Sequence, residues 1–143
     1  MANSSEIITL HRYFIWANKM RTDFDALLAQ RNPVIEDENK LNIESNIYMS
    51  YWYGGLYVVI EGWLNLKLSD PVIDSLLNSD NVGLLKRYRN GVFHFQKKYY
   101  DNRFLDFITE GENTVEWVRN LNREFGRWFL EWFDKMKQNP TRA

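Results

Sequence analysis

The sequence lacks cysteine altogether and has only two histidines among its 143 residues. Without cysteine the chain can form no disulfide and offers no thiol nucleophile, and this absence fits a reducing compartment. With so few histidines, a metal site of the histidine and cysteine type is difficult to assemble. We therefore expect neither a metal site nor a bound cofactor.

Proline and glycine are also scarce, with three and seven copies. So few turn-forming residues favour long regular elements over a turn-rich β architecture. No stretch approaches 18 apolar residues, and the first ten residues lack a signal-peptide pattern, so we expect a cytoplasmic protein without a membrane partner. The length is typical of one domain, so residues 1–143 are expected to form a single domain.

The chain is instead rich in aromatic residues, which make up 16% of it, and 45% of its residues are hydrophobic, enough for a core. The net charge is only −1, but basic residues concentrate between positions 86 and 103, where Asp101 is the one acid. This basic segment contains Lys86, Arg87, Arg89, Lys97, Lys98 and Arg103. A local basic surface on a near-neutral chain suits an anionic ligand held at one site.

Apolar residues recur at three- and four-residue spacing along most of the chain, which predicts an all-α fold, a four-to-five-helix up-down bundle. Long helices are expected over residues 5–30, 43–68, 82–100 and 113–137, and short ones over 71–78 and 102–108, with a polar loop at 31–41. Asp70 before Pro71 has the pattern of an N-cap with proline at the first helical position. Asp101 is expected to cap the second short helix.

The second long helix, 43–68, is apolar around most of its circumference and should be the most buried. Its small and polar residues share one narrow strip, formed by Ser50, Gly54, Glu61 and Asn65. A buried carboxylate needs a partner. Glu61 is therefore expected within reach of Arg89, His94 or another basic group of the third long helix.

The most informative stretch is Arg89-Asn90-Gly91-Val92-Phe93-His94. On a continuous helix Asn90 and His94 stack on one face, while Arg89 lies about 140° around the helix from His94. One phosphate can bridge Arg89 and His94 only if the helix bends at Gly91 or a second copy of the chain closes over this surface. Phe93 is expected to point outward, as a residue of a two-fold interface would.

An arginine and a histidine together suffice to cleave RNA without a metal. His94 can move the proton of a 2′-hydroxyl group, and Arg89 can neutralise the charge that develops on the phosphate. Asn90 would orient His94 or a phosphate oxygen, and Lys86 and Lys97 would attract the RNA backbone.

The order Arg-Asn-x-x-x-His in a small helical chain resembles the HEPN domain family. The signature of that family is an arginine, often followed by a polar residue, with a histidine four to six residues after the arginine. The resemblance implies a HEPN-like fold and, for many members, metal-independent endoribonuclease activity as a toxin or antiviral effector. In these members two Arg/His pairs face each other across the cleft of a homodimer. One branch has a nucleotidyltransferase antitoxin as partner and carries a tyrosine two residues after the histidine, where this chain has Gln96.

Other interpretations stay open. Some members of the family have lost catalysis, so the alternative is a non-catalytic HEPN-like module that binds a nucleotide, RNA or a protein partner. Arg89 and His94 can also be ordinary solvated residues of a structural bundle within a larger complex.

Overall fold

The computed structural model describes residues 1–30 and 38–139, and all regular structure in these two ranges is helical. The helices are α1 (Ser4–Ala29), α2 (Glu38–Asn65), α3 (Pro71–Leu76), α4 (Asn81–Phe93), α5 (Asn102–Thr109) and α6 (Thr114–Gln138). The all-α prediction is confirmed. None of the helices in the described ranges combines the length and apolarity needed to cross a bilayer.

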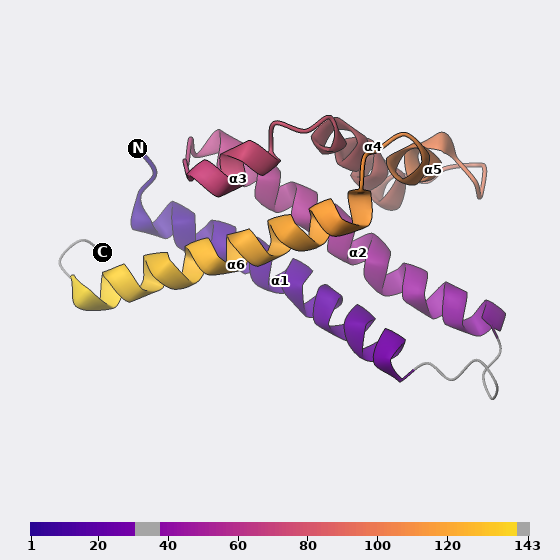
Figure 1. Ribbon diagram of the computed structural model, residues 1–143, viewed down its shortest axis with the longest axis horizontal. Coiled ribbons are helices and arrows are strands. Elements are labelled where there is room, and N and C mark those ends of the chain that lie inside the picture. The colour runs from indigo at the N-terminus through magenta and orange to yellow at the C-terminus, as the bar shows by residue number, and fades with distance from the viewer. Residues whose placement is uncertain (31–37, 140–143) are drawn as a thin grey trace.

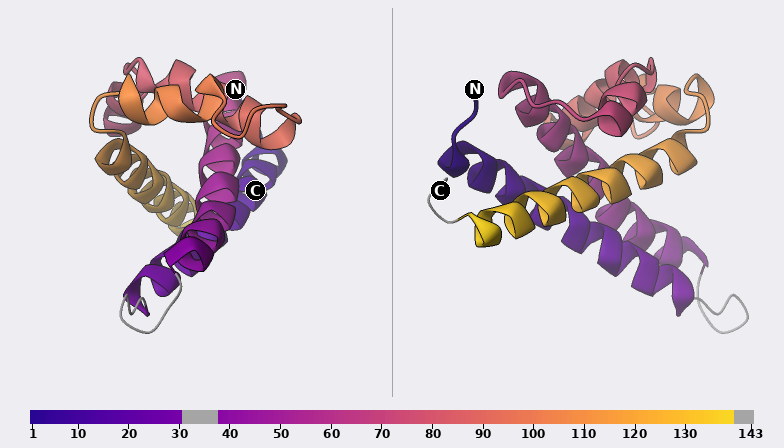
Figure 2. Two further views of the ribbon diagram at one scale, coloured as in Figure 1. Left: turned by 90° about the vertical axis from the view of Figure 1, so that its right-hand side faces the viewer. Right: turned by 60° about the vertical axis from the view of Figure 1, so that its left-hand side comes forward.

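The two longest helices, α1 and α2, lie side by side and antiparallel, and α6 crosses over them obliquely (Figures 1 and 2). Helix α4 packs against α2, and α5 packs against α4. The chain therefore does not form a simple up-down bundle, and that part of the prediction is wrong. The short helices α3 and α5 redirect the chain, so that α6 returns across the α1–α2 pair at an angle.

Two glycines of α2 allow α1 to approach closely. A Cβ atom on Gly55 would come within 3.2 Å of the Ala17 Cβ, and one on Gly62 would overlap the Leu10 side chain. Side chains at these two positions would separate the helices. The glycines thus set the spacing of the α1–α2 pair on which the other helices pack.

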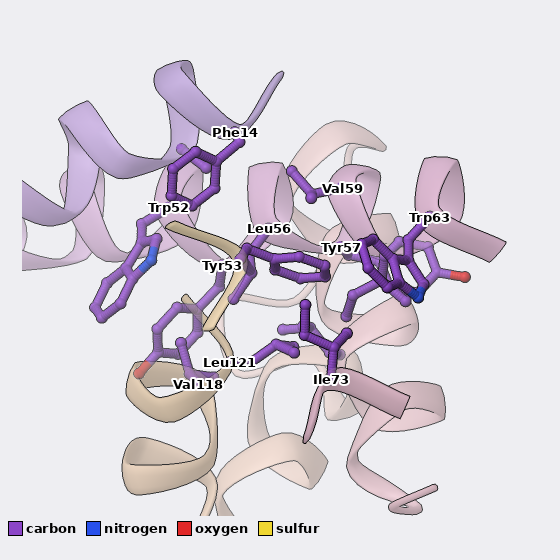
Figure 3. Close-up of a cluster of buried hydrophobic side chains, with 14 of the residues drawn as sticks. Phe14, Trp52, Tyr53, Leu56, Tyr57, Val59, Trp63, Ile73, Val118 and Leu121 are labelled. Carbon is purple, nitrogen blue, oxygen red and sulfur yellow. The ribbon is translucent and has the colours of Figure 1, made fainter. Parts of the chain in front are cut away.

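The core is centred on the C-terminal half of α2 (Figure 3). Seven apolar residues of α2 are buried, more than on any other helix, which confirms the prediction that it is the most buried one. They are Trp52, Tyr53, Leu56, Tyr57, Val59, Ile60 and Trp63. The part of α2 around Ile43 and Ile47 lies outside this core, since these two side chains are 59% and 49% exposed.

Polar side chains inside the core are satisfied by contacts between helices. The Trp52 Nε1 donates to Asn122 Oδ1 of α6 at 3.0 Å, and the Trp63 Nε1 donates to Asp74 Oδ1 of α3 at 3.1 Å. The Asn122 amide donates in turn to Asn18 Oδ1 of α1 at 3.0 Å. Because an unpaired polar group is costly inside a protein, these bonds fix how α1, α3 and α6 are oriented around α2.

The helix starts follow the sequence signals closely. The Asp70 carboxylate accepts hydrogen bonds from the Val72 and Ile73 amides, and the Asp101 carboxylate accepts one from the Arg103 amide at 2.9 Å. Both caps were predicted. The predicted loop 31–41 is wrong over 38–41, where α2 has already begun, and its residues 31–37 lie outside the described residues.

The end of α4 departs most from the prediction, because the helix stops at Phe93 instead of continuing to residue 100. Gly91 faces α5 so closely that a Cβ there would lie 2.9 Å from the Phe104 ring. The chain must therefore reverse directly after Phe93 to bring α5 against the last turn of α4. As a result Phe95 and Tyr99, which continue the apolar spacing of α4 in the sequence, are 92% and 76% exposed.

Candidate functional site

The predicted motif lies at the C-terminal end of α4, where this helix packs on α2. The Arg89 guanidinium lies over the Tyr57 ring, 4.9 Å from its centroid, and the Arg89 Nε donates to Asn90 Oδ1 at 3.0 Å. The Arg89 Nη1 is 3.6 Å from a carboxylate oxygen of Glu61. Only 21% of the Arg89 side chain is exposed, so these contacts hold its guanidinium in one place.

Glu61 lies within reach of Arg89, as predicted, but its side chain is 56% exposed, so the expectation of a buried carboxylate is wrong. The residue sits on the rim of α2, where solvent reaches it. Burial, and secondly the charge of Glu61, raise the pKa of Tyr57. The phenol beneath Arg89 therefore stays neutral at physiological pH and presents an intact ring face to the guanidinium.

The polar strip of α2 proves to be the surface on which α4 rests. The Ser50 hydroxyl is 3.4 Å from the Tyr88 hydroxyl, and a Cβ on Gly54 would lie 2.9 Å from the Phe93 ring. Small residues on α2 thus accept the large side chains of α4. The strip has a packing role as well as the contact between Glu61 and Arg89.

His94 lies one residue beyond the end of α4, with an extended backbone at φ −122° and ψ 126°. The predicted stacking of Asn90 and His94 on one helix face is therefore wrong, although the His94 amide still donates to the Asn90 carbonyl at 3.0 Å. The His94 side chain lines a cavity of about 500 Å³ between α4, α5 and the N-terminal half of α2. Arg89 is not part of this lining, so the cavity brings His94 together with aromatic rings and not with Arg89.

Residues 94–101, the α4–α5 loop, connect the two helices through an ordered set of hydrogen bonds. The Gln96 side chain donates to the His94 carbonyl at 2.8 Å, and Arg103 donates to Gln96 Oε1 at 2.9 Å and to Asp101 at 3.1 Å. The bond from the Arg103 amide, and secondly its guanidinium, lower the pKa of the Asp101 carboxyl. The sequence prediction missed this loop, because it continued the helix as far as residue 100, directly before the N-cap at Asp101.

A second, smaller cavity of about 310 Å³ adjoins the same loop and is lined mainly by charged residues. Its lining consists of Arg87, Lys98, Tyr100, Asp101, Asn102 and Arg103. Lys98 and Tyr100 also line the cavity that contains His94, so the two cavities are neighbours. Arg87 forms an ion pair with Asp106 of α5 at 2.6 Å.

The remaining predicted residues lie around the end of α4. Lys86 and Lys97 are exposed, and Phe93 is 52% exposed, as expected for an outward residue. The Phe93 ring lies 6.1 Å from the Tyr51 ring, centroid to centroid, and Tyr51 is itself 51% exposed. Ile47 and Ile43 lie one and two turns before Tyr51 on α2, and together with the two rings they form an exposed apolar surface, which we call the α2–α4 apolar surface.

A groove of about 570 Å³ between α1 and α6 was not foreseen from the sequence. At one end His11 lies against the Phe129 and Phe133 rings, with centroids 5.0 and 4.8 Å away. Burial lowers the pKa of His11. At the other end Asp25 accepts hydrogen bonds from Arg21, one turn earlier on α1, and from Arg119 of α6, and the bond from Arg119 joins the two helices. His11 therefore packs against the aromatic rings of α6, and the ion pair between Asp25 and Arg119 holds α1 against α6.

Across residues 1–30 and 38–139 no three side chains of histidine, aspartate or glutamate gather in a metal-binding arrangement. No protein-family model matches the chain, and neither a curated protein nor a solved structure is detectably similar to it. The interpretation of the site therefore depends on its own geometry and chemistry.

Proposed function

We propose that this chain is a metal-independent endoribonuclease of HEPN type that acts as a homodimer. The observation that carries the proposal is the fixed position of Arg89. Its guanidinium is held by Tyr57, Asn90 and Glu61 at the end of α4, next to the α2–α4 apolar surface. A second copy that covers this surface would place its own His94 opposite the Arg89 of the first.

The chemistry requires one base, one acid and one cation. In the proposed reaction His94 of one copy accepts the proton of the RNA 2′-hydroxyl, and the O2′ atom attacks the adjacent phosphorus. The bond from phosphorus to O5′ breaks, and His94 of the other copy protonates the leaving O5′. Arg89 neutralises the additional negative charge on the phosphoryl oxygens. The products are a 2′,3′-cyclic phosphate and a 5′-hydroxyl end.

In this scheme Glu61 occupies the position beside the Arg89 guanidinium that the substrate phosphate would take. Its contact with Arg89 is long, at 3.6 Å, and the carboxylate is more than half exposed. Ion pairs of this kind contribute little free energy. A phosphate can therefore take the place of Glu61 on the guanidinium without a large loss, while Tyr57 and Asn90 keep the arginine in position.

The alternative is a HEPN-like module that binds RNA, a nucleotide or a protein and has no catalytic activity. The separation of Arg89 from His94 within one copy, together with the carboxylate already beside Arg89, favours this reading. Dimerisation distinguishes the two proposals, because only the catalytic one requires two copies to complete the site.

The test of catalysis is cleavage of RNA in the presence of EDTA. His94→Ala should lower the cleavage rate by roughly 10²–10⁴-fold, which is the usual contribution of a general acid or base. Arg89→Ala should lose roughly 10²–10³-fold. Arg12→Ala, which removes an exposed arginine of α1, is the matched control and should cleave like the wild type. Full activity in both site variants, or loss of activity on chelation, would exclude the mechanism.

The test of the dimer is the mass in solution. Light scattering should give twice the 17.2 kDa mass of the chain. Phe93→Glu should yield monomers and abolish cleavage together, because the charge would lie inside the interface. Leu130→Glu, which changes a 69% exposed residue of α6, should leave the dimer intact. A wild-type monomer at tens of micromolar would contradict the proposal.

A further inference from the structure

The α4–α5 loop distributes its side chains in an unusual way. Phe95, Tyr99 and Tyr100 are 92%, 76% and 73% exposed, while Gln96 and Asp101 form hydrogen bonds within the loop and with Arg103. Soluble proteins usually bury large aromatic side chains, and clusters that remain exposed mark binding surfaces. The loop therefore exposes a cluster of aromatic rings of the kind found at binding surfaces.

The loop is held in this conformation by contacts at both ends. The Gln96 and Arg103 side chains join its two halves, and the close approach of Gly91 to Phe104 fixes α5 against α4. The exposed rings of Tyr99 and Tyr100 also contact each other edge to face, with centroids 5.0 Å apart. A preorganised surface loses less conformational entropy when it binds.

Two neighbouring cavities beside this loop differ in chemistry. The larger one, of about 500 Å³, is walled by aromatic rings that include Phe95, Tyr99 and Tyr100, and its size lies within the roughly 300–1,000 Å³ of small-ligand sites. The smaller cavity, of about 310 Å³, is lined by three cationic side chains, those of Arg87, Lys98 and Arg103. Because Lys98 and Tyr100 line both cavities, a ligand that fills them would carry a flat apolar group joined to an anion.

We propose that the α4–α5 loop binds one nucleotide unit of a single-stranded RNA. The base stacks against the exposed rings of Tyr99 and Tyr100, and the phosphate lies at Lys98 and Arg103. Stacking on aromatic side chains beside a basic groove is the general mode of single-strand recognition. A paired base cannot stack on these rings, so the strand must be unpaired at this position.

The charge of the surface supports a nucleic acid over a protein partner. Four cations surround the loop (Arg87, Lys97, Lys98 and Arg103) against two carboxylates, those of Asp101 and Asp106, which leaves a local charge of +2. A protein partner would cover the rings but would have no need for the cationic cavity. The phosphate of RNA matches it.

This inference deepens the proposed function and rests on it in one respect, because His94 lines the same aromatic cavity. The bound nucleotide would then bring its own sugar close to the histidine that acts on the 2′-hydroxyl. The substrate class that follows is RNA with an unpaired nucleotide at the cleaved bond, in a loop, a bulge or a single strand.

Binding can be measured apart from cleavage with a short, fluorescently labelled 2′-O-methyl RNA strand, which has no free 2′-hydroxyl to react. Tyr100→Ala and Tyr99→Ala should each weaken the affinity about tenfold. Lys98→Ala should reduce the slope of log affinity against log salt by about 0.7, the value for one phosphate contact on a single strand. The controls are Trp16→Ala, which removes a 59% exposed ring of α1, and Lys135→Ala on α6, and both should bind as the wild type does.

Two further ligands identify what is bound. A hairpin duplex of the same sequence should bind more weakly than the single strand. A mononucleotide that competes as well as the strand does would overturn the assignment and identify a free nucleotide as the ligand. Loop variants that change the mass in light scattering while keeping the wild-type RNA affinity would overturn it in favour of a protein interface.

The outcomes separate this inference from the proposed ribonuclease activity. If the strand binds through Tyr100 and Lys98 but no RNA is cleaved, the inference holds and the ribonuclease proposal fails. If RNA is cleaved in EDTA and the loop variants bind and cleave like the wild type, the ribonuclease proposal holds and the inference fails.

Discussion

The C-terminal half of α2 and the α4–α5 loop are both rich in aromatic residues, yet they have opposite environments. In α2, Trp52 and Trp63 are 1% and 0% exposed, and three other helices surround them. In the loop, Phe95 and Tyr100 are 92% and 73% exposed. The comparison shows that aromatic content does not itself distinguish core from surface. The position of the neighbouring helices decides whether an aromatic side chain is buried or exposed.

The two regions also differ in how polar atoms are used. In α2 the indole nitrogens of Trp52 and Trp63 each donate to a side chain of another helix, so the polar contacts serve the fold. In the loop the polar contacts of Gln96 and Arg103 stay within the loop and its flanking residues. The first region is thus tied to global stability, and the second is tied to the shape of one surface.

The largest effect on stability is expected in the core. Trp63→Ala should lower the free energy of unfolding by about 3–5 kcal/mol, because it leaves a cavity beside the Phe125 and Trp128 rings, 5.6 and 5.0 Å away, and removes the indole donor to Asp74 Oδ1. Urea denaturation followed by circular dichroism measures the change. A loss below about 1 kcal/mol would mean that the α2 core is not the main source of stability.

A smaller loss is expected at the polar contact between three helices. Asn122→Ala should cost about 1–3 kcal/mol, because the Trp52 indole and the Asn18 amide lose a partner inside the protein. Asn120→Ala, whose amide oxygen accepts from exposed Arg123, is the matched control and should change stability by less than about 0.5 kcal/mol. Equal losses in both variants would contradict the role given to Asn122.

The carboxylate of Asp25, which joins α1 to α6, and that of Asp101 in the loop should respond differently to acid. The hydrogen bond from Arg119 is the main cause that lowers the pKa of Asp25, so its stabilising effect is present above the ordinary carboxyl pKa and is lost as pH falls through the lowered value. Asp25→Asn should therefore reduce the acid-induced fall in global stability, measured by denaturation at a series of acidic pH values. Asp101→Asn, which replaces one good N-cap by another in the loop, should leave the global transition nearly unchanged. The reverse order of effects would contradict the comparison.

The smallest effect is expected in the loop. Phe95→Ala, Tyr99→Ala and Tyr100→Ala should each change the free energy of unfolding by less than about 0.5 kcal/mol, because solvent already surrounds these rings. The same variants are expected to weaken RNA binding. A large loss of stability would show that the rings are covered in solution, which would place the loop with the core.

Most helices could be predicted from the sequence because their signals are local. The apolar spacing of α1 and α6, and the caps at Asp70 and Asp101, each lie within one or two turns of the chain. The end of α4 could not be found in this way. Val92, Phe95 and Tyr99 keep a helical spacing, and only the packing of Phe104 against Gly91, a contact between helices, shows that the helix must end.

The candidate site was predicted in part for the same reason. Glu61 was found beside Arg89 because a polar strip on an apolar helix indicates where a polar partner packs. The placement of His94 failed because it depended on the length of α4. The aromatic loop was missed because Phe95 and Tyr99 continue the three- and four-residue spacing of apolar residues on α4, which is the spacing of a buried helix face.

The way α6 is attached has a consequence for folding kinetics. Its contacts with α1 join residues far apart in sequence, 94 positions for Asp25 with Arg119 and 104 for Asn18 with Asn122, whereas α1 and α2 are neighbours along the chain. Closing long loops is entropically costly and slows folding. We expect the α1–α2 pair to form first and α6 to dock after the rate-limiting barrier. Substitutions such as Asn122→Ala should then accelerate unfolding and leave the folding rate nearly unchanged.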